Sequence, residues 1–445
     1  MMKKKEVLVI SEYFAPLNSI ASIRFTKILK YLSKTKKYHF TVISRKSMDK
    51  YDSGMKKELQ NMGEYVDVFY IDILDNFIDK LRKKQRQNRE QVVSSRNDVK
   101  KFKPYMEATL QEKLYKCLNT LKYIYNEQIF VKRGMKCIRA VNIKFDYVIS
   151  TYGDAGAHLL ALKYKKHHKN VKWIADYRDP ALTYYRPPIF NFYFNSIISS
   201  TIKKAYVITG VAKGALGRCA NYKKSKVIIN GFDREEVEGL QENSDLFQDK
   251  KLHICYTGRI YGGKSDAGVL FRVLKELSDN KEINISDICV DYAGTNFDLL
   301  YEQAEAYEVA EILVNHGFVE HLKALEMQRQ SDILLVLSWN DDDEEDVLTG
   351  KFMEYLMVER QILAIVKGNK KNCLIKKILS ESKAGYCYEE ARGEEDVDSL
   401  KRFIQEKYLE FMREGRISYN GDTVYLNKFS YKTIAKEFGK FLVDK

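Results

Sequence analysis

The sequence is poor in proline, lacks paired cysteine motifs and contains no long apolar run. Only 5 of its 445 residues are proline, which excludes a rigid Pro-rich linker. Its seven cysteines are odd in number and none shows C-x-x-C spacing, so we expect buried, reduced thiols rather than a disulfide framework or a zinc site. No stretch of about 18 apolar residues predicts a membrane-spanning helix. The start MMKKKEVLVISEYF lacks a small-residue cleavage site, so we expect a cytoplasmic protein without a signal peptide.

The charge is divided unevenly along the chain. Residues 1–232 hold 46 Lys and Arg against 19 Asp and Glu, a net charge of +27, whereas residues 233–445 hold 29 against 42, a net charge of −13. Hydrophobic residues make up 45% of the chain, which is typical of a folded globular protein. The length and this asymmetry predict separate domains that face different partners.

Short apolar runs alternate with longer amphipathic stretches in both halves. This alternation predicts parallel sheets covered by helices. In the first half we expect a helix over 21–34 and strands at 6–10, 39–44, 66–73, 145–150, 171–176, 205–209 and 226–229. In the second half we expect helices over 319–330 and 351–359 and strands at 252–257, 287–293, 312–314, 332–338 and 362–366. The polar stretch 231–250 is predicted to be a linker, so the domains are 1–232 and 233–428, with a terminal helix within 429–445.

A glycine-rich segment, YTGRIYGGKSDAGVLF at 256–271, follows one of these strands. Such a loop lets the backbone approach a phosphate, and the helix that follows favours an anion at its N-terminus. Arg259 and Lys264 add two cations, which together suit a diphosphate. The alternative is a plain turn between a strand and a helix, with solvated charges.

The segment VLTGKFMEYL at 347–356 is a second candidate site. Amides at the start of a predicted helix can bind a phosphate, and Glu354 lies on the same helix face as Lys351. A carboxylate there can accept hydrogen bonds from a ribose diol. Alternatively, Glu354 only complements the helix dipole.

The order of these segments resembles GT-B glycosyltransferases of glycosyltransferase family 4, of the type that builds bacterial capsule and O-antigen polysaccharides. The similar segments are VLVISEYFAPLNSIASIRFTKILKYL, FDYVISTYGDAGAH, WIADYRDP, VIINGFD, YTGRIYGGK, VNHGFV and LTGKFMEYL. The resemblance spans nearly the whole chain apart from 76–140. It implies a GT-B fold: two Rossmann-like domains with parallel sheets facing across a cleft, and a terminal helix that packs back on the N-terminal domain.

By this resemblance, the C-terminal domain binds a nucleotide-sugar donor. Arg259 and Lys264 neutralise the diphosphate and the charge that develops on the leaving nucleotide, while Glu354 binds the ribose. The implied donor-binding residues are Gly258, Arg259, Lys264, Gly317, Phe318, Val319, Thr349, Gly350, Lys351 and Glu354. The family's E-x7-E motif is D-x7-E here, because Asp346 stands eight residues before Glu354. The acidic run 341–346 is predicted to be a solvated loop rather than a cation site.

The N-terminal domain supplies the candidate acceptor side. The candidate catalytic residues are His158, Arg178, Asp179, Arg259 and Lys264, and the candidates for the acceptor or phosphate side are Asn18, Ser19, Arg24 and Asp154. For several of them a structural role competes. His158 is also placed to cap or pack a helix, Arg178 to pair with neighbouring aspartates, and Arg24 to be a surface cation.

The basic insertion 76–140 is predicted to contain two or three helices and a mobile loop near 86–103. Its lysines, leucines and tyrosines favour an anionic membrane surface over a solvated helical face, and no nucleic-acid motif accompanies them. The predicted function is transfer of a sugar from a nucleoside-diphosphate sugar, a UDP-sugar, to a glycan or lipid-linked glycan, with retention of configuration. No cofactor and no metal are expected. Two alternatives are a GT-B sugar-nucleotide epimerase and a non-catalytic assembly protein of the same fold.

Overall fold

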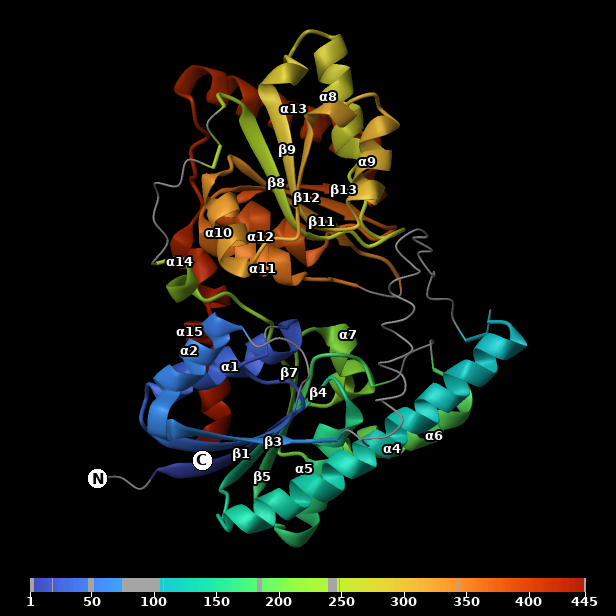
Figure 1. Ribbon diagram of the computed structural model, residues 1–445, viewed down its shortest axis with the longest axis vertical. Coiled ribbons are helices and arrows are strands. Elements are labelled where there is room, and N and C mark those ends of the chain that lie inside the picture. Colours follow the sequence, from blue (N-terminus) through green and yellow to red (C-terminus); the bar gives the residue numbers. More distant parts are fainter. Residues whose placement is uncertain are drawn as a thin grey trace. The chain divides into compact units, whose positions relative to one another are not determined.

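The computed structural model describes residues 4–17, 19–46, 52–73, 105–106, 108–181, 186–238, 246–247, 249–342 and 345–443. The chain forms two compact units, one comprising Met1–Ile229 and Ile434–Lys445, the other Asn230–Thr433. Each unit is built on an all-parallel sheet with helices along it (Figure 1). In the described part of the chain, no helix is both long enough and apolar enough to cross a membrane.

The first unit contains a seven-stranded sheet in the order β3-β2-β1-β4-β5-β6-β7. Its strands are β1 (Lys5–Ser11), β2 (Tyr38–Arg45), β3 (Val66–Ile71), β4 (Tyr147–Tyr152), β5 (Lys172–Tyr177), β6 (Val207–Gly210) and β7 (Ser225–Val227). Successive strands leave β1 on one side and β4 on the other, so the order reverses between these two strands. In doubly wound sheets, ligands bind beyond the carboxyl ends of the strands at this reversal.

Helices cover both faces of the first sheet. They are α1 (Ile20–Ser33), α2 (Ser53–Met62), α4 (Leu110–Val141), α5 (Ala155–His167), α6 (Asn191–Lys204) and α7 (Lys213–Leu216). One core joins the sheet to α4, α5 and α6 and contains Leu8, Val148 and Trp173, all fully buried. On α1, Phe25 packs edge-on against Phe438, with ring centroids 5.6 Å apart. The last residues of the chain therefore belong to the core of this unit.

Helix α4 is a single helix of 32 residues. It begins with a capping box, in which the Thr109 hydroxyl and the Glu112 carboxylate each accept a backbone N–H of the first turn. Its second half packs on α5, and a Cβ on Gly134 would lie 2.5 Å from Leu160, so only glycine permits this approach. The two or three helices predicted for 76–140 are thus one continuous helix over the described residues. The loop predicted near 86–103 lies outside the described residues.

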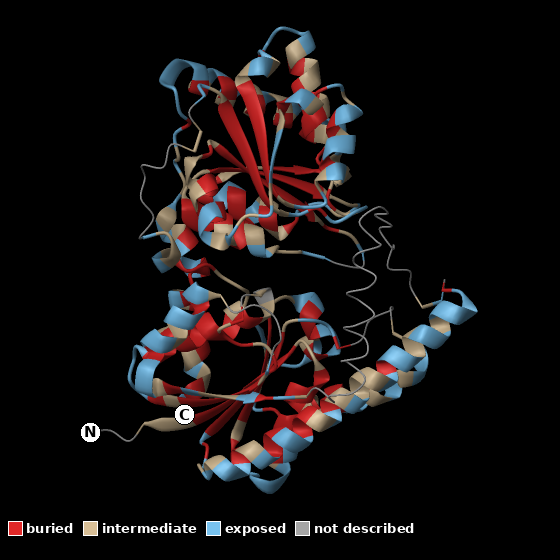
Figure 2. Cartoon of the chain, in the orientation of Figure 1, coloured by how far each residue is buried: buried red, intermediate tan, exposed pale blue. Residues whose placement is uncertain are grey.

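The second unit contains a six-stranded sheet in the order β10-β9-β8-β11-β12-β13. Its strands are β8 (Leu252–Arg259), β9 (Ile288–Thr295), β10 (Leu313–Gly317), β11 (Ile333–Trp339), β12 (Gln361–Lys367) and β13 (Gly385–Glu389). Its helices are α8 (Gly268–Asp279), α9 (Phe297–Glu305), α10 (His321–Gln330), α11 (Gly350–Val358), α12 (Leu374–Ser382), α13 (Glu394–Glu414) and α14 (Thr423–Leu426). Helix α15 (Tyr431–Gly439) follows, and its residues from Ile434 onward belong to the first unit. The inner strands of both sheets are almost entirely buried, whereas the edge strands β3, β7 and β10 are partly exposed and the outward faces of the helices are exposed (Figure 2).

The predicted strands agree with the observed ones to within a few residues, but β13 and α13 are among the elements of the second unit that were not predicted. Strand β13 has the sequence GYCYE, which lacks the run of aliphatic residues that marks the other buried strands. Helix α13 is rich in charged residues and buries only one narrow face, including Leu400 and Ile404. Both elements depend on packing against the rest of the unit, which local periodicity does not report.

Candidate functional site

The glycine-rich segment forms a tight loop at the carboxyl end of β8. The Tyr292 hydroxyl donates a hydrogen bond to the Gly258 carbonyl at 3.0 Å, which fixes the end of the strand. A Cβ on Gly294, opposite in β9, would lie 1.8 Å from that same carbonyl oxygen. Gly263 has a φ of +80°, a left-handed conformation that glycine adopts without steric cost. The loop therefore needs Gly263 for its turn, and the close approach at its base needs Gly294 of β9.

Arg259 and Lys264 are both held against aromatic rings of this loop. The Arg259 guanidinium lies 5.7 Å from the centroid of the Tyr261 ring, and Lys264 Nζ lies 4.8 Å from that of Trp339. Because the two rings contact each other at 5.9 Å, the two cations share one aromatic surface. Cation–π contacts of this kind orient a charge without neutralising it. The structure thus brings together the two cations that the sequence assigned to a diphosphate.

Glu354 lies in a polar group at the same edge of the sheet. Its Oε1 accepts hydrogen bonds from Lys351 Nζ at 2.7 Å and from Gln328 Nε2 at 2.5 Å. Gln328 also donates to the Thr257 hydroxyl at 2.7 Å, one residue before Gly258. His321 Nδ1 lies 4.0 Å from Glu354 Oε2. Helix α11 therefore presents its lysine and glutamate beside the end of β8.

The other residues predicted for the donor side lie at the start of α11 and at the end of β10 or just beyond it. The Thr349 hydroxyl accepts the Phe352 N–H at 3.2 Å, so it caps the helix and its oxygen is already engaged. Gly350 and Lys351 follow in the first turn. At the end of β10, Gly317 has a φ of +67° and the Phe318 side chain is 82% exposed. Val319 follows and is half-buried.

A hollow of about 350 Å³ adjoins the glycine-rich loop on the side of α8 and α9. Gly262 and Gly263 line one side of it, and Glu302 and Gln303 of α9 line the other. Glu354 and Lys351 do not line it. The polar group around Glu354, rather than this hollow, carries the chemistry expected of a nucleotide site.

The first carboxylate of the D-x7-E pattern faces another helix. Asp346 Oδ1 accepts the Leu374 N–H at 2.9 Å, at the first residue of α12, and Asp346 has a φ of +56°. Elsewhere in the acidic run, Lys370 Nζ lies 3.4 Å from Asp342 and 3.5 Å from Glu345. The described acids of this run are therefore tied to their own unit and do not converge on Glu354.

Arg24, a candidate phosphate ligand, is instead fully buried in an ion pair. Its Nη2 and Nε donate to the two carboxylate oxygens of Asp176 at 2.9 and 3.2 Å, and its Nη1 donates to the Ile229 carbonyl at 3.0 Å. Burial raises the pKa of Asp176, but Arg24 and two threonine hydroxyls outweigh burial and hold it below its ordinary value. Because Arg24 is fully buried in this bidentate pair, the structure favours a structural role for it over the predicted phosphate role.

His158 is also buried, within an aromatic cluster. Its Nδ1 lies 3.0 Å from the Ser150 hydroxyl oxygen, which accepts a hydrogen bond from Trp173 Nε1 at 2.8 Å. The rings of Tyr152 and Tyr177 lie 5.2 and 4.7 Å away, both nearly perpendicular. Burial lowers the pKa of His158 to about 3, so the ring is neutral. The geometry supports the packing role of His158, because its ring is fully buried among aromatic side chains.

Arg178 and Asp154 lie together at the carboxyl ends of β4 and β5. The Arg178 guanidinium lies over Gly153, where a Cβ would lie 1.5 Å from Nη2, and 5.6 Å from the Tyr13 ring. Arg178 Nε is buried with no hydrogen-bond partner among the described residues. The Tyr13 hydroxyl donates to Asp154 at 2.8 Å. Arg178 therefore keeps one buried N–H without a partner among the described residues, whereas Arg24 Nε is paired with Asp176.

The remaining candidates on the acceptor side are placed less favourably. Asp179 is 65% exposed at its side chain and only 4.0 Å from Arg178 Nη2. Ser19 caps α1, with its hydroxyl accepting the Ser22 N–H at 3.3 Å. Asn18 lies outside the described residues.

One buried group was missed by sequence reasoning. Arg45 forms ion pairs with both Glu12 and Glu127, and these carboxylates accept the Ala157 and Gly156 N–H groups at the start of α5. Burial, and then the neighbouring Glu127, raise the pKa of Glu12 well above its ordinary value. This group closes the N-terminus of α5, so that helix end cannot bind a phosphate. Glu127 is an acidic residue among the lysines and tyrosines of α4. In the sequence this indicates a basic partner but not which residue that partner is.

Comparison with known proteins shows the fold and no closer relationship. No family model matches the chain. A search of curated proteins likewise finds no match. Among solved structures, a UDP-forming trehalose-phosphate synthase from Burkholderia xenovorans superposes with a TM-score of 0.59 at 9% identity, over 99% of each chain. The fold is GT-B.

Two further GT-B structures agree over the whole chain. A trehalose-6-phosphate structure from E. coli bound with UDP-2-fluoro glucose gives a TM-score of 0.58 at 11% identity, covering 98% of this chain and 99% of the other. A putative UDP-N-acetylglucosamine 2-epimerase from Listeria monocytogenes gives 0.50 at 13% identity, covering 99% and 98%. At these identities the likeness extends to the fold, and the chemistry rests on the residues described above.

Proposed function

We propose that the chain is a retaining glycosyltransferase that resembles family 4 and transfers a sugar from a UDP-sugar to a glycan or lipid-linked glycan in surface polysaccharide synthesis. The observation that carries this proposal is the convergence of Gly258, Lys351 and Glu354 with the Arg259–Lys264 pair at the carboxyl end of β8. A structural neighbour with the same fold is bound with UDP-2-fluoro glucose, which supports a uridine nucleotide as the donor.

The proposed site stabilises the leaving nucleotide by charge. Arg259 and Lys264 face the diphosphate, and the amides of Gly350 and Lys351 at the start of α11 add the positive end of a helix. Glu354 accepts the ribose hydroxyls, in competition with its present partners Lys351 and Gln328. As the bond from the sugar to the diphosphate breaks, negative charge grows on the phosphate oxygen, and preorganised cations there lower the barrier. No metal is required for that step.

Calorimetry with UDP tests the donor site. Arg259→Ala, Lys264→Ala and Glu354→Ala are each expected to weaken UDP binding by roughly tenfold or more, because a hydrogen bond to a charged group contributes about 1.5–3 kcal/mol. Lys275→Ala is the matched control. Lys275 lies on α8, away from the loop, and its Nζ pairs with Asp279 Oδ1 at 3.0 Å. Unchanged UDP affinity in all three site variants would show that the donor site is misplaced.

The epimerase alternative is supported by one neighbour of the same fold. It predicts a different product from the same donor. An epimerase converts a nucleotide sugar in the absence of any acceptor, whereas the proposed transferase releases UDP only when a hydroxyl acceptor is present. Product analysis with and without a lipid-linked acceptor separates the two. A non-catalytic assembly protein would bind UDP but would neither convert the nucleotide sugar nor transfer its sugar to an acceptor.

Association with an anionic membrane surface belongs to the same proposal. Five exposed apolar side chains form one stripe along the first half of α4, at spacings of three and four residues: Leu110, Leu114, Leu118, Leu121 and Tyr125. The start of α6 lies alongside, because Tyr193 contacts Gln128 at 3.2 Å, and it exposes Ile189 and Phe192. A basic domain with such a surface suits a lipid headgroup layer.

A further inference from the structure

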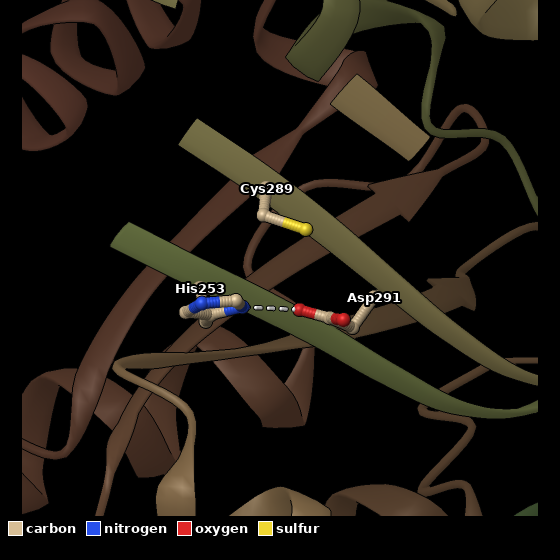
Figure 3. Close-up of side chains that lie close together, drawn as sticks. All are labelled: His253, Cys289 and Asp291. Atoms are coloured by element: carbon tan, nitrogen blue, oxygen red, sulfur yellow. Dashed lines mark hydrogen bonds and ion pairs between the residues drawn. The ribbon is translucent and has the colours of Figure 1, made fainter. Parts of the chain in front are cut away.

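A second polar cluster lies in the second unit, towards the amino ends of its strands. His253 of β8 and Cys289 and Asp291 of β9 point toward one another from adjacent strands (Figure 3). Their nitrogen, sulfur and oxygen atoms all lie within 4.8 Å of one another. His253 Nδ1 is 2.6 Å from Asp291 Oδ2. At about 3.3 Å per residue, the five residues from His253 to Gly258 separate this cluster from the diphosphate site by roughly 16 Å.

The strand register explains why these residues meet. His253 pairs with Cys289 in the parallel ladder, and Cys255 pairs with Asp291, so all four side chains lie on one face of the sheet. The register of β10 shifts between Asn315 and Gly317, and this irregularity directs His316 towards the cluster. His316 Nε2 lies 2.7 Å from Asp291 Oδ1. Three strands therefore supply two imidazoles, a thiol and a carboxylate to one place.

Two further residues surround His253. Its Nε2 lies 2.6 Å from Asp249 Oδ1, and the Phe247 ring stacks on the imidazole with centroids 4.0 Å apart. Both ring nitrogens of His253 therefore donate to carboxylates. A metal ion would replace the proton on Nδ1, while Asp249 would still accept Nε2–H and hold the orientation of the ring. Metal-binding histidines generally have such an outer carboxylate, and an apolar neighbour keeps water away.

We propose that His253, Cys289, Asp291 and His316 bind one Zn²⁺. Two nitrogens, one sulfur and one oxygen form a ligand set that suits zinc, and four protein ligands are typical of a structural rather than a catalytic site. Around a tetrahedral zinc the ligand atoms stand roughly 3.3–3.7 Å apart. The contacts of Asp291 with His253 and His316, now 2.6 and 2.7 Å, would each open by less than about 1 Å, and the Cys289 sulfur already lies within 4.8 Å of the His253 and Asp291 ligand atoms. With one thiolate, one carboxylate and two neutral imidazoles, the bound ion is fully neutralised.

The site would hold β8, β9 and β10 together and attach the segment around Phe247 and Asp249 to them. The spacing of the cysteines did not predict this zinc site, because the site has only one thiol. Its ligands come from three strands, β8, β9 and β10. Asp291 and Cys289 are buried, 1% and 5% exposed, while His316 is partly exposed and provides a path for the ion to enter. The proposal does not depend on the glycosyltransferase assignment.

Metal analysis of the full chain, produced without a histidine tag, tests the proposal. The protein is stripped with a chelator, loaded with Zn²⁺ and measured for bound zinc, and a second sample is loaded with Co²⁺ for absorption spectroscopy. We expect one zinc per chain, a higher melting temperature with zinc than without, and a thiolate-to-cobalt charge-transfer band. Cys289→Ser should abolish that band. Asp249→Asn should weaken zinc binding about 10–100-fold while keeping the band.

The control is Cys387→Ser, which removes another buried cysteine of the same unit and should leave the zinc content and the cobalt band unchanged. The proposal is overturned if the folded wild-type chain binds no stoichiometric zinc, or if its cobalt complex lacks a thiolate band. It is also overturned if Cys289→Ser keeps that band. The wild-type measurements decide the question even where a variant fails to fold. A negative result would leave the cluster as an ion pair, in which His253 is an imidazolium between Asp249 and Asp291.

Discussion

At the scale of single residues, burial separates arginines and histidines that look alike in the sequence. Arg24 is fully buried with both donors of its fork on Asp176, whereas Arg259 is exposed beside Tyr261. A buried guanidinium stabilises the fold only together with its partner, and removing one member leaves an uncompensated charge. An exposed guanidinium that is oriented by a ring remains available to an anion. The same residue type therefore serves the fold in one unit and the proposed donor site in the other.

His158 gives the stability of the protein a defined dependence on pH. Its pKa in the folded protein is about 3, against about 6.5 in the unfolded chain, because the ring is buried. Between these two pKa values the unfolded chain therefore binds a proton at His158 that the folded chain does not bind. The contribution is fully present above pH 6.5, and about 1.4 kcal/mol is lost for each pH unit as the pH falls from there towards 3. We expect His158→Gln to remove this slope between pH 7 and pH 5.

Urea unfolding at pH 7 and at pH 5 measures the effect of His158. The relevant quantity is the change in unfolding free energy between the two pH values, compared between the wild type and His158→Gln. His167→Gln is the control, because His167 is exposed at the end of α5 and its removal should leave the change unaltered. An equal pH dependence in wild type and His158→Gln would mean that the ring is protonated in the folded state.

At the scale of elements, the N-terminus of α12 holds the acidic run 341–346 through Asp346. Asp346 caps α12 through its hydrogen bond to the Leu374 N–H, so we expect Asp346→Ala to lower the unfolding free energy by about 1 kcal/mol. The UDP affinity of Asp346→Ala should stay within twofold of wild type, whereas Glu354→Ala should reduce UDP affinity strongly. Asp342→Ala, in the same loop but highly exposed, should affect neither. Urea titration and calorimetry on the same variants report both quantities. A large loss of UDP binding in Asp346→Ala would place that carboxylate at the donor after all.

At the scale of the whole molecule, the unequal charge of the two halves predicts how the chain meets a membrane. Raising the ionic strength from about 0.01 M to 0.15 M shortens the Debye length from about 30 Å to 8 Å. Binding to anionic vesicles should therefore weaken with salt, and neutral vesicles should bind less at every ionic strength. Leu114→Glu combined with Leu118→Glu should reduce binding more than tenfold, since each leucine buried in lipid contributes about 1.5–3 kcal/mol.

The matched control for the vesicle experiment is Leu322→Glu, because Leu322 is equally exposed (61%) but lies on α10 in the acidic unit. Vesicle flotation measures bound protein for each variant. Binding that depends neither on salt nor on the α4 substitutions would refute the membrane surface. An equal loss of binding in the double α4 variant and in Leu322→Glu would indicate a general effect on solubility.

Strands and helices with regular apolar spacing were predictable because each position's neighbours along the chain already reveal the buried face. The placement of Arg259, Lys264 and Glu354 at one edge of the sheet was also predictable, because the carboxyl ends of parallel strands meet at the same edge. The acceptor side was predicted less well. Arg24 and Asp176 are 152 residues apart, and nothing local in either segment shows that β5 lies beside the helix that carries Arg24.

The sequence by itself determined the alternation of strands and helices, the division of charge between the halves and the position of the glycine-rich loop, because each is a property of neighbouring residues. The tertiary structure alone decided which charges are buried and paired. It placed Arg24 in the core, closed α5 with Glu12 and Glu127, and joined His253 to Asp291 and His316 across three strands. The physical reason is that a charge is stabilised by whatever lies within a few ångströms of it, and the sheet topology sets that distance.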